Sequence, residues 1–411
     1  MTKIFRISYL NFLSIVFILF SFAPLFIANL LSSDNVTSTL SFYSFLRIFS
    51  QVGLFLVLVS CSLCFRYEKI KFRRYDILVM VLLILMFATR LISIVYNAVD
   101  MVEYAKYLIF FLYVFNYLFI FSFVINHVDS FGFVVVFSKT FMFCVLIYCF
   151  FSLFFYFNNN SLSLKLGFPL MPGVFAFYCV IALLIALMVQ KSFCLAGFFF
   201  LMILLSGSRS AIMLSILCLL WNCYNRKSGW IFIASLTVLS ISAIFFVPDL
   251  RLLLSRVFDP SRVDISSGRF GIWRDAVGII TGNPLLGLGQ RPVFEVVNVL
   301  YPLRAHNTFL ELSATYGLLH ALLAYLVWSF YYPGKIMYRQ LGMMMRSQDL
   351  LTYGRLLFWL VVIKSFITTT FWTNMGDPAV HFVFLILISL KSLIKEDRFS
   401  IDITTKGIVT C

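Results

Sequence analysis

The side chains best suited to chemistry lie in a polar stretch between residues 248 and 317. This stretch contains seven arginines and no lysine, and the arginines precede or flank the pair His306 and Asn307. The seven are Arg251, Arg256, Arg262, Arg269, Arg274, Arg291 and Arg304. A guanidinium presents two parallel N–H donors to a phosphate or carboxylate, which an ammonium cannot do. The exclusive use of arginine therefore indicates recognition of such an anion.

His306 is the candidate general base of this stretch. A free imidazole titrates near pH 6.5, so among the side chains of the stretch it is best matched to accepting a proton at neutral pH. Thr308 and Glu311 have the spacing of a capping box, which predicts that a helix opens directly after His306. The imidazole could instead hold a phosphate oxygen as a cation, and the sequence leaves both roles open.

A second candidate anion site lies at residues 206–209, which read Ser-Gly-Ser-Arg. These residues join two apolar runs of about fifteen residues each, at 192–206 and 210–224, and leave no room for a loop. We expect Ser208 to cap the second helix, where free backbone N–H groups and the positive end of the helix dipole favour an anion. Arg209 would add a charge to that site.

Composition identifies the elements that must position these residues. Of 411 residues, 62% are hydrophobic, 12% are charged and fifty are phenylalanine, which no soluble core of this size could hide. The chain contains about twelve apolar runs that could cross a membrane. They lie at 8–32, 42–65, 76–97, 107–126, 138–157, 172–190, 192–206, 210–224, 229–247, 309–332, 355–373 and 379–394. We expect an all-α polytopic membrane protein with a partly helical insert between spans 9 and 10.

The short loops that carry Lys and Arg indicate the cytoplasmic side. Residues 66–74 are densely basic, and by this rule both termini are cytoplasmic. The insert then faces outward against the charge rule, which long loops escape. The predicted organisation is helices 1 to 9 in residues 1–247, the insert in 248–307, and helices 10 to 12 with a cytoplasmic tail in 308–411, forming one functional domain. The net charge of +15 suits anionic lipid head groups and is no reason to expect nucleic acid.

Within the insert, Arg269, Phe270, Trp273, Arg274 and Val277 have the spacing of an amphipathic helix that lies at the membrane surface, with Trp273 as an interfacial anchor. Residues 281–284 (Thr-Gly-Asn-Pro) should end this helix. Residues 287–289 (Gly-Leu-Gly) predict a flexible turn after it.

Charged side chains inside spans are functional candidates by default. Arg90, near the outer end of the third span, is the clearest of these, and Lys165 in an outward loop is a further candidate. Lys139 is better explained by snorkelling to the inner surface. Neither cysteine pairing nor clustered acidic ligands are evident, so we expect no disulfide framework, no metal and no cofactor.

Three motifs follow one another along the chain. The first is residues 206–209 (Ser-Gly-Ser-Arg). The second is Gly268-Arg269 to Trp273 together with residues 283–289 (Asn-Pro-Leu-Leu-Gly-Leu-Gly), and the third is His306-Asn307 followed by Gly317. Together they resemble the bacterial O-antigen ligase and O-antigen polymerase (Wzy-type) superfamily. The resemblance covers roughly residues 170–330. His320 departs from it, since the family pattern has Gly, Thr or Tyr at that place.

The resemblance implies transfer of a glycan from an undecaprenyl-diphosphate carrier to an acceptor hydroxyl at the periplasmic face of the bacterial inner membrane, without metal or nucleotide sugar. We expect His306, Arg269 and Arg209 to be catalytic, with the two arginines holding the diphosphate. Other candidate contacts to the diphosphate or glycan are Ser208, Arg274, Arg291, Asn307, Arg304, Arg90 and Lys165.

Within this class a polymerase, whose acceptor is another lipid-linked repeat unit, is favoured over a ligase acting on lipid A-core, because the insert is compact. The rival class is a transporter or flippase of lipid-linked glycan. Such folds are expected to show two related halves, and the halves of this chain look unlike. A structural scaffold would leave the choice of arginine unexplained. Besides the lipid-linked glycan and the membrane, a chain-length regulator or a flippase protein is a candidate partner.

Overall fold

The computed structural model describes the chain mainly in its helical segments. The described residues are 71–99, 130–158, 172–225, 269–290, 305–333, 344–367, 378–392 and 398–400, together with Phe22, Ile27, Val52, Tyr104 and Tyr107. They are helical apart from their connecting turns and a short antiparallel pair, β1 (Lys71–Arg73) with β2 (Arg398–Ser400). The predicted helical class is therefore confirmed for this part of the chain.

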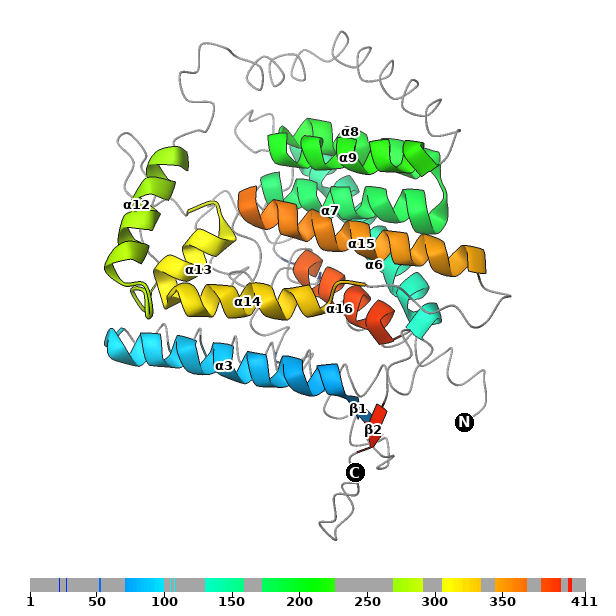
Figure 1. The fold of residues 1–411 in the computed structure, drawn as a ribbon. Helices are drawn as coiled ribbons and strands as arrows, with labels where there is room; N and C mark the ends of the chain where they lie inside the picture. Colours follow the sequence, from blue (N-terminus) through cyan, green and yellow to red (C-terminus); the bar gives the residue numbers. More distant parts are fainter. Residues whose placement is uncertain are drawn as a thin grey trace. The chain divides into compact units, whose positions relative to one another are not determined.

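The helices follow one another in the order predicted from the apolar runs (Figure 1). They are α3 (Arg74–Tyr96), α6 (Ser130–Asn158), α7 (Pro172–Ile185), the π-helix η2 (Ala186–Gln190), α8 (Phe193–Ser206), α9 (Arg209–Asn225), α12 (Arg269–Gly282), α13 (Thr308–Tyr316), α14 (Leu318–Phe330), α15 (Met344–Ile367) and α16 (Pro378–Ser392). The predicted spans at 8–32, 42–65, 107–126 and 229–247 lie, apart from single positions, outside the described residues, so the count of twelve stays a prediction.

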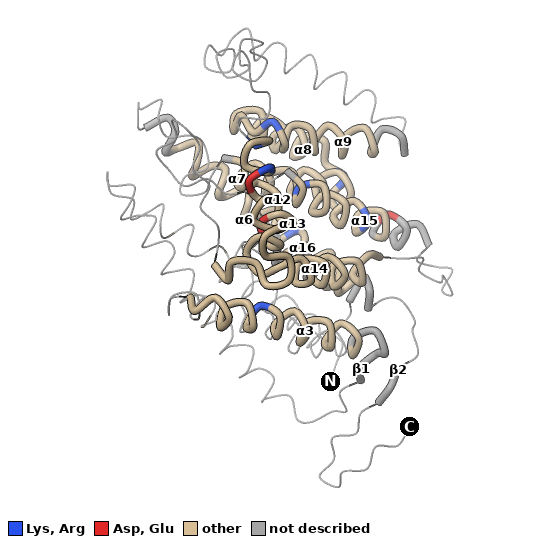
Figure 2. Tube along the Cα trace, turned by 60° about the vertical axis from the view of Figure 1, so that its left-hand side comes forward, with Lys and Arg blue, Asp and Glu red and all other residues tan. Residues whose placement is uncertain are grey.

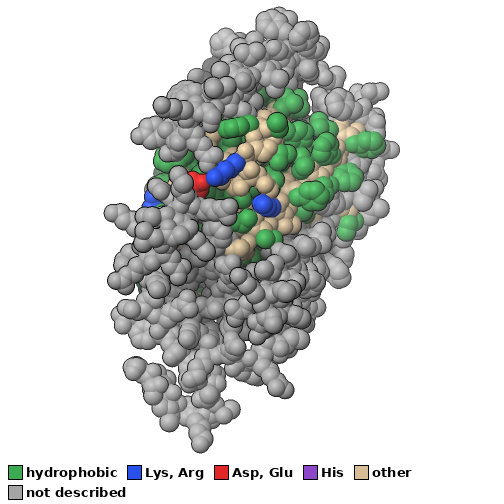
Figure 3. All heavy atoms as spheres, turned by 90° about the vertical axis from the view of Figure 1, so that its right-hand side faces the viewer, with side chains coloured by type: hydrophobic (Ala, Val, Ile, Leu, Met, Phe, Trp, Pro, Cys, Tyr) green, Lys and Arg blue, Asp and Glu red, His purple; other side chains and the backbone are tan. Residues whose placement is uncertain are grey.

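Three of the described helical segments are long and apolar enough to cross a membrane: Ile77–Tyr96, Gly132–Phe154 and Gly173–Gln190. Lys, Arg, Asp and Glu are sparse along the described helices (Figure 2). Hydrophobic side chains cover much of the described surface seen in Figure 3. On α3, one face carries large exposed apolar side chains, including Ile84 and Val95, as expected where a helix meets lipid rather than water.

The chain divides into two compact units. The first unit comprises residues 1–50, 132–263 and 340–357, and the second comprises residues 51–131, 264–339 and 358–411. The first therefore holds α7, α8 and α9, and the second holds α3, α12, α13 and α14. We describe each unit by itself.

In the first unit, α7 is the central helix and packs against α8 and α9. Every residue from 175 to 187 is buried, which agrees with a helix that is hydrophobic on all sides. The helix ends in the π-turn of η2 and a left-handed Lys191, and the ammonium of Lys191 lies 3.2 Å from the carboxylate of Asp349. The short helices α8 and α9 confirm the predicted pair at 192–206 and 210–224.

In the second unit, α14 and α13 pack against α3, and α12 packs against α13 (Figure 1). The prediction of one continuous span at 309–332 is wrong, because the helix breaks at Gly317 into α13 and α14. Gly317 has a φ of 92°, and the N–H of Leu318 donates to the carbonyl of Pro284 instead of continuing the first helix (2.8 Å). The chain segment that follows α12 thus lies against the break.

We predict that Gly317→Ala destabilises the protein by more than about 2 kcal/mol, because φ is positive and because a methyl group would meet backbone. A Cβ at Gly317 would lie 1.9 Å from the carbonyl oxygen of Leu285, which must then move. The thermal unfolding midpoint in detergent measures the effect. Gly278→Ala is the matched control, since a Cβ at Gly278 in α12 meets nothing within 4 Å; equal midpoints for the two variants would contradict the prediction.

Candidate active site

The candidate site is built where α12 meets the start of α13. Trp273 of α12 donates its indole N–H to the backbone carbonyl of Ala305, with 2.7 Å between the nitrogen and the oxygen. Around this bond, Ile272, Ala276 and Ala305 form a buried apolar cluster. Arg269 precedes Trp273 by four residues and therefore lies on the same face of α12. The hydrogen bond thus brings the helix of Arg269 against the residue that precedes His306.

His306 lies in a turn with an unusual backbone. Its φ is 50°, in the left-handed region that a non-glycine residue enters at a cost of about 1–2 kcal/mol. Asn307 is extended and is the N-cap of α13, because its side-chain oxygen accepts a hydrogen bond from the N–H of Leu310 (3.1 Å). The predicted cap at Thr308 is wrong by one residue. The asparagine caps the helix equally well, since its side chain is as short and offers the same kind of acceptor.

The loop at the other end of α12 is fixed by backbone hydrogen bonds. The N–H groups of Leu288 and Gly289 donate to the carbonyls of Ala314 and Thr315, at 2.9 and 2.8 Å. Both Gly287 and Gly289 are buried and have positive φ, and a Cβ at either would lie within 3.0 Å of neighbouring atoms. The prediction of a flexible turn at residues 287–289 is therefore wrong. The glycines allow this loop to approach the backbone at the end of α13.

The C-terminal end of α3 holds the same loop through polar side chains. The hydroxyl of Ser93 donates to the carbonyls of Leu286 and Thr315, and the amide of Asn97 donates to the carbonyl of Gly287 (3.3 Å). Asn97 also donates to the carbonyl of Ser93 (2.8 Å). These contacts join a membrane-spanning helix to the loop that follows α12.

A buried polar cluster lies one to two turns before Ser93 in α3. Arg90 is 6% exposed, and its guanidinium carbon lies 4.4 Å from the centroid of the Tyr316 ring, a cation–π contact. The Tyr316 ring meets the His320 ring edge-on, and Nδ1 of His320 donates to the carbonyl of Met86 (3.0 Å). These contacts account for His320 at a place where the family pattern has another residue.

The second predicted anion site lies in the first unit, between α8 and α9. Gly207 closes α8 with a φ of 66°, and the carbonyl of Ser208 accepts from the N–H of Ile212, which makes Ser208 the residue that opens α9. Its hydroxyl lies 3.4 Å from that of Ser210. A Cβ on Gly173, in the first turn of α7, would lie 3.7 Å from the Ser208 hydroxyl. Two helices therefore begin close to Ser208.

The predicted site residues fall into three groups. Arg269, His306, Asn307, Arg274 and Arg90 belong to the second unit. Ser208 and Arg209 belong to the first unit, and Arg209 is exposed. Arg291, Arg304 and Lys165 lie outside the described residues.

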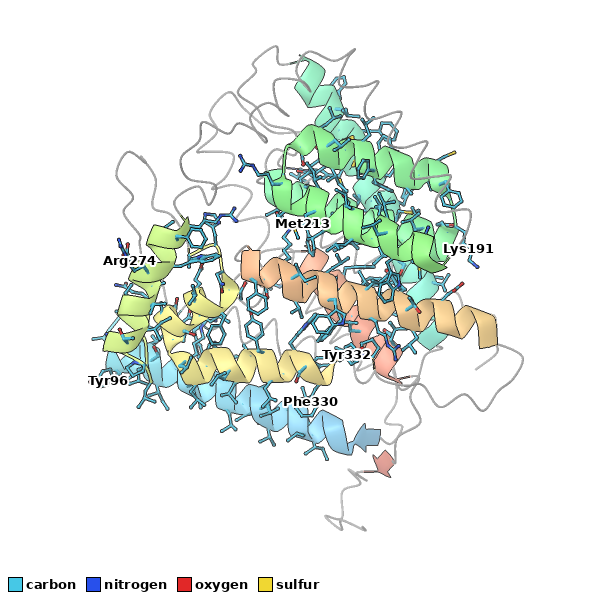
Figure 4. All side chains as sticks on the ribbon, turned by 45° about the horizontal axis from the view of Figure 1, so that its top comes forward. Tyr96, Lys191, Met213, Arg274, Phe330 and Tyr332 are labelled. Carbon is cyan, nitrogen blue, oxygen red and sulfur yellow. The ribbon has the colours of Figure 1, made fainter. Side chains whose placement is uncertain are left out.

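Arg274 and Arg90 differ from the other members of the second unit in where they lie. The Arg274 side chain is 87% exposed, lies 3.9 Å from the carboxylate of Asp275 and points away from α13 (Figure 4). Arg90 lies on α3, is buried, and contacts the ring of Tyr316, the last residue of α13.

Three residues that hold these segments together through hydrogen bonds were not among the predicted site residues: Trp273, Ser93 and Asn97. A signal for the last two is present in the sequence, because Met86, Arg90, Ser93 and Asn97 recur at intervals of three or four residues on one face of an otherwise apolar helix. In the part of the chain that the structure describes, there is no group of three or more His, Cys, Asp or Glu that could hold a metal ion.

The apolar helices indicate a helical membrane protein, whose second unit carries Arg269 on α12 and His306 just before α13. A family model described as O-antigen ligase (Wzy_C) matches residues 193–325, from the start of α8 into α14. The resemblance to the O-antigen ligase and polymerase superfamily is thereby confirmed, and the matched domain indicates glycan transfer of this type. No match is found among curated proteins.

Proposed function

We propose that the protein transfers a glycan from an undecaprenyl-diphosphate carrier to an acceptor hydroxyl at the periplasmic face of the bacterial inner membrane. The observation that carries the proposal is the Trp273–Ala305 hydrogen bond. This bond joins the helix of Arg269 to the turn of His306, within the segment that matches the O-antigen ligase family. The reaction requires a base for the acceptor proton and a cation for the diphosphate, and these two segments carry an imidazole and a guanidinium.

In the proposed reaction, the acceptor oxygen forms a bond to the anomeric carbon of the donor sugar. The bond between that carbon and the diphosphate breaks, and its electron pair stays on the phosphate oxygen. His306 takes the proton of the acceptor hydroxyl as the new bond forms. Arg269 stabilises the charge that develops on the diphosphate, because a guanidinium can donate two hydrogen bonds to phosphate oxygens.

Arg209 is the second proposed ligand of the diphosphate. Two helices, α7 and α9, begin close to Ser208, and the N-terminus of a helix carries free N–H groups and partial positive charge. Together with the Arg209 guanidinium, these groups favour an anion at the turn between α8 and α9.

The proposed orientation has both termini in the cytoplasm and the site in the periplasm. It is supported by pairs of segments that the predicted topology assigns to one side and that are in contact. On the cytoplasmic side these are β1 with β2 and Lys191 with Asp349. On the periplasmic side the amide of Asn97 donates to the carbonyl of Gly287. Each pair lies within one unit.

We propose a polymerase, whose acceptor is a second lipid-linked repeat unit, with a ligase acting on lipid A-core as the alternative. The test uses the purified protein in liposomes with lipid-linked repeat units, with and without lipid A-core, and without an ion gradient. A polymerase lengthens the glycan from donor alone, whereas a ligase gives product only when lipid A-core is present. If neither mixture gives product while lipid-linked glycan crosses the bilayer, the protein is a flippase and the proposal is wrong.

A further inference from the structure

Trp273 contacts the peptide group that leads directly into His306. The carbonyl of Ala305 and the N–H of His306 belong to one planar peptide unit, so a hydrogen bond to that carbonyl fixes the orientation of the whole plane. Trp273 supplies this bond at 2.7 Å from the neighbouring helix. The φ of His306 is the rotation about its N–Cα bond, which connects this peptide unit to the rest of the residue. The indole therefore acts on the one backbone angle that is unusual at this site, 50° at His306.

The residue that follows His306 in the chain is held in place as well. Asn307 is extended, its side chain accepts from the N–H of Leu310, and its carbonyl accepts from the N–H of Glu311 (3.0 Å). With the preceding plane fixed by Trp273 and the following residue fixed by the helix cap, the imidazole can leave the backbone in only a narrow range of directions. A left-handed non-glycine residue persists only where its surroundings hold it in this way.

The spacing along α12 connects this support to the proposed diphosphate ligand. Arg269 and Trp273 are four residues apart in α12 and therefore share a face of the helix. Displacement of α12 relative to α13 would change the distance between base and anion ligand. A misplacement of about 1 Å in such a pair can lower a rate by about 10²-fold.

We propose that Trp273 is a positioning residue for His306: its indole N–H sets the peptide plane from which the imidazole projects and holds it beside Arg269. The inference rests on the proposed function insofar as His306 is the base. It extends that function by assigning the tryptophan of the Gly-Arg-x-x-x-Trp motif a role in the reaction rather than in membrane anchoring.

The test is Trp273→Phe, which keeps an aromatic ring next to Phe270 and removes the N–H donor together with part of the indole. We expect kcat for glycan transfer to fall about 10- to 100-fold, with the KM for the lipid-linked donor changed by less than about twofold. Amide hydrogen exchange at Leu310 and Glu311 should become at least about threefold faster. Trp359→Phe is the matched control, because the Trp359 side chain on α15 is half exposed and lies outside the site.

A double variant separates positioning from general stability. If Trp273 acts through His306, then adding Trp273→Phe to the His306→Asn variant does not lower kcat any further. If kcat of the double variant is lower than that of His306→Asn, or if Trp273→Phe lowers the unfolding midpoint, Trp273 has a structural role and the inference is overturned. Normal kcat and unchanged exchange also overturn it. Failure of the wild-type protein to make product counts against the proposed function alone, because the exchange measurement still tests the contact.

Discussion

Replacing His306 with asparagine is expected to lower the rate of glycan transfer by about 10²- to 10⁴-fold, the range that a general base supplies. Asparagine is preferred to alanine because it tolerates the left-handed backbone, and His306 has a φ of 50°. The substitution therefore removes the imidazole without adding backbone strain. Initial rates in liposomes at saturating lipid-linked donor measure the effect, with the amount of folded protein determined for each sample.

The pH dependence of the wild-type rate distinguishes the two roles of His306. A base must be neutral to accept the acceptor proton, so the rate should rise with pH as the imidazole loses its proton. A histidine that holds phosphate as a cation would give a rate that falls over the same interval. If the asparagine variant keeps more than about a tenth of the wild-type rate, His306 is not the base, since a general base supplies at least about 10²-fold.

Replacing Arg269 with lysine is expected to reduce transfer by about 10²-fold, nearly as much as replacing it with alanine. Lysine keeps the positive charge but loses the paired donors that match two phosphate oxygens. Removing one hydrogen-bond donor to an oxygen that becomes negatively charged in the transition state typically lowers kcat by about 10²- to 10³-fold. The measurement is kcat with the lipid-linked donor, since an interaction made mainly in the transition state lowers kcat more than it raises KM.

Arg274→Lys is the comparison for this prediction. Arg274 lies on the same helix, but its side chain is 87% exposed and points away from α13 (Figure 4). Exchanging an exposed arginine for lysine should change the rate by less than about threefold. A fully active Arg269→Lys variant would indicate that charge alone is sufficient, and equal losses at the two positions would remove the special role of Arg269.

Local patterns in the sequence were sufficient to predict the elements. Apolar run length identified α3, α7, α8, α9 and α16 closely, because the thickness of a bilayer sets the number of residues that a span needs. The amphipathic spacing identified α12, and Thr281 to Pro284 correctly marked its end. The motifs identified the region that matches the O-antigen ligase family.

Contacts between distant residues account for what the sequence did not show. The helix break at Gly317 was missed because a single glycine within a helical pattern is usually tolerated and does not by itself end a helix. The break depends on Leu318 and Pro284, which are neighbours only after folding. Ser93 and Thr315 are 222 residues apart in the chain, and no local pattern pairs them. The fixed loop at Gly287 depends on the same packing, because its hydrogen bonds go to α13 and α3.

The sequence by itself determined which side chains are present for chemistry and which segments form helices, since residue type and apolar periodicity are local properties. Only the tertiary structure decided that Trp273 holds the carbonyl of Ala305, that Asn307 rather than Thr308 caps α13, and that His306 adopts a left-handed backbone. These features depend on the packing of α12 against α13, and a backbone angle is set by the partners of its neighbouring peptide groups rather than by the identity of one residue.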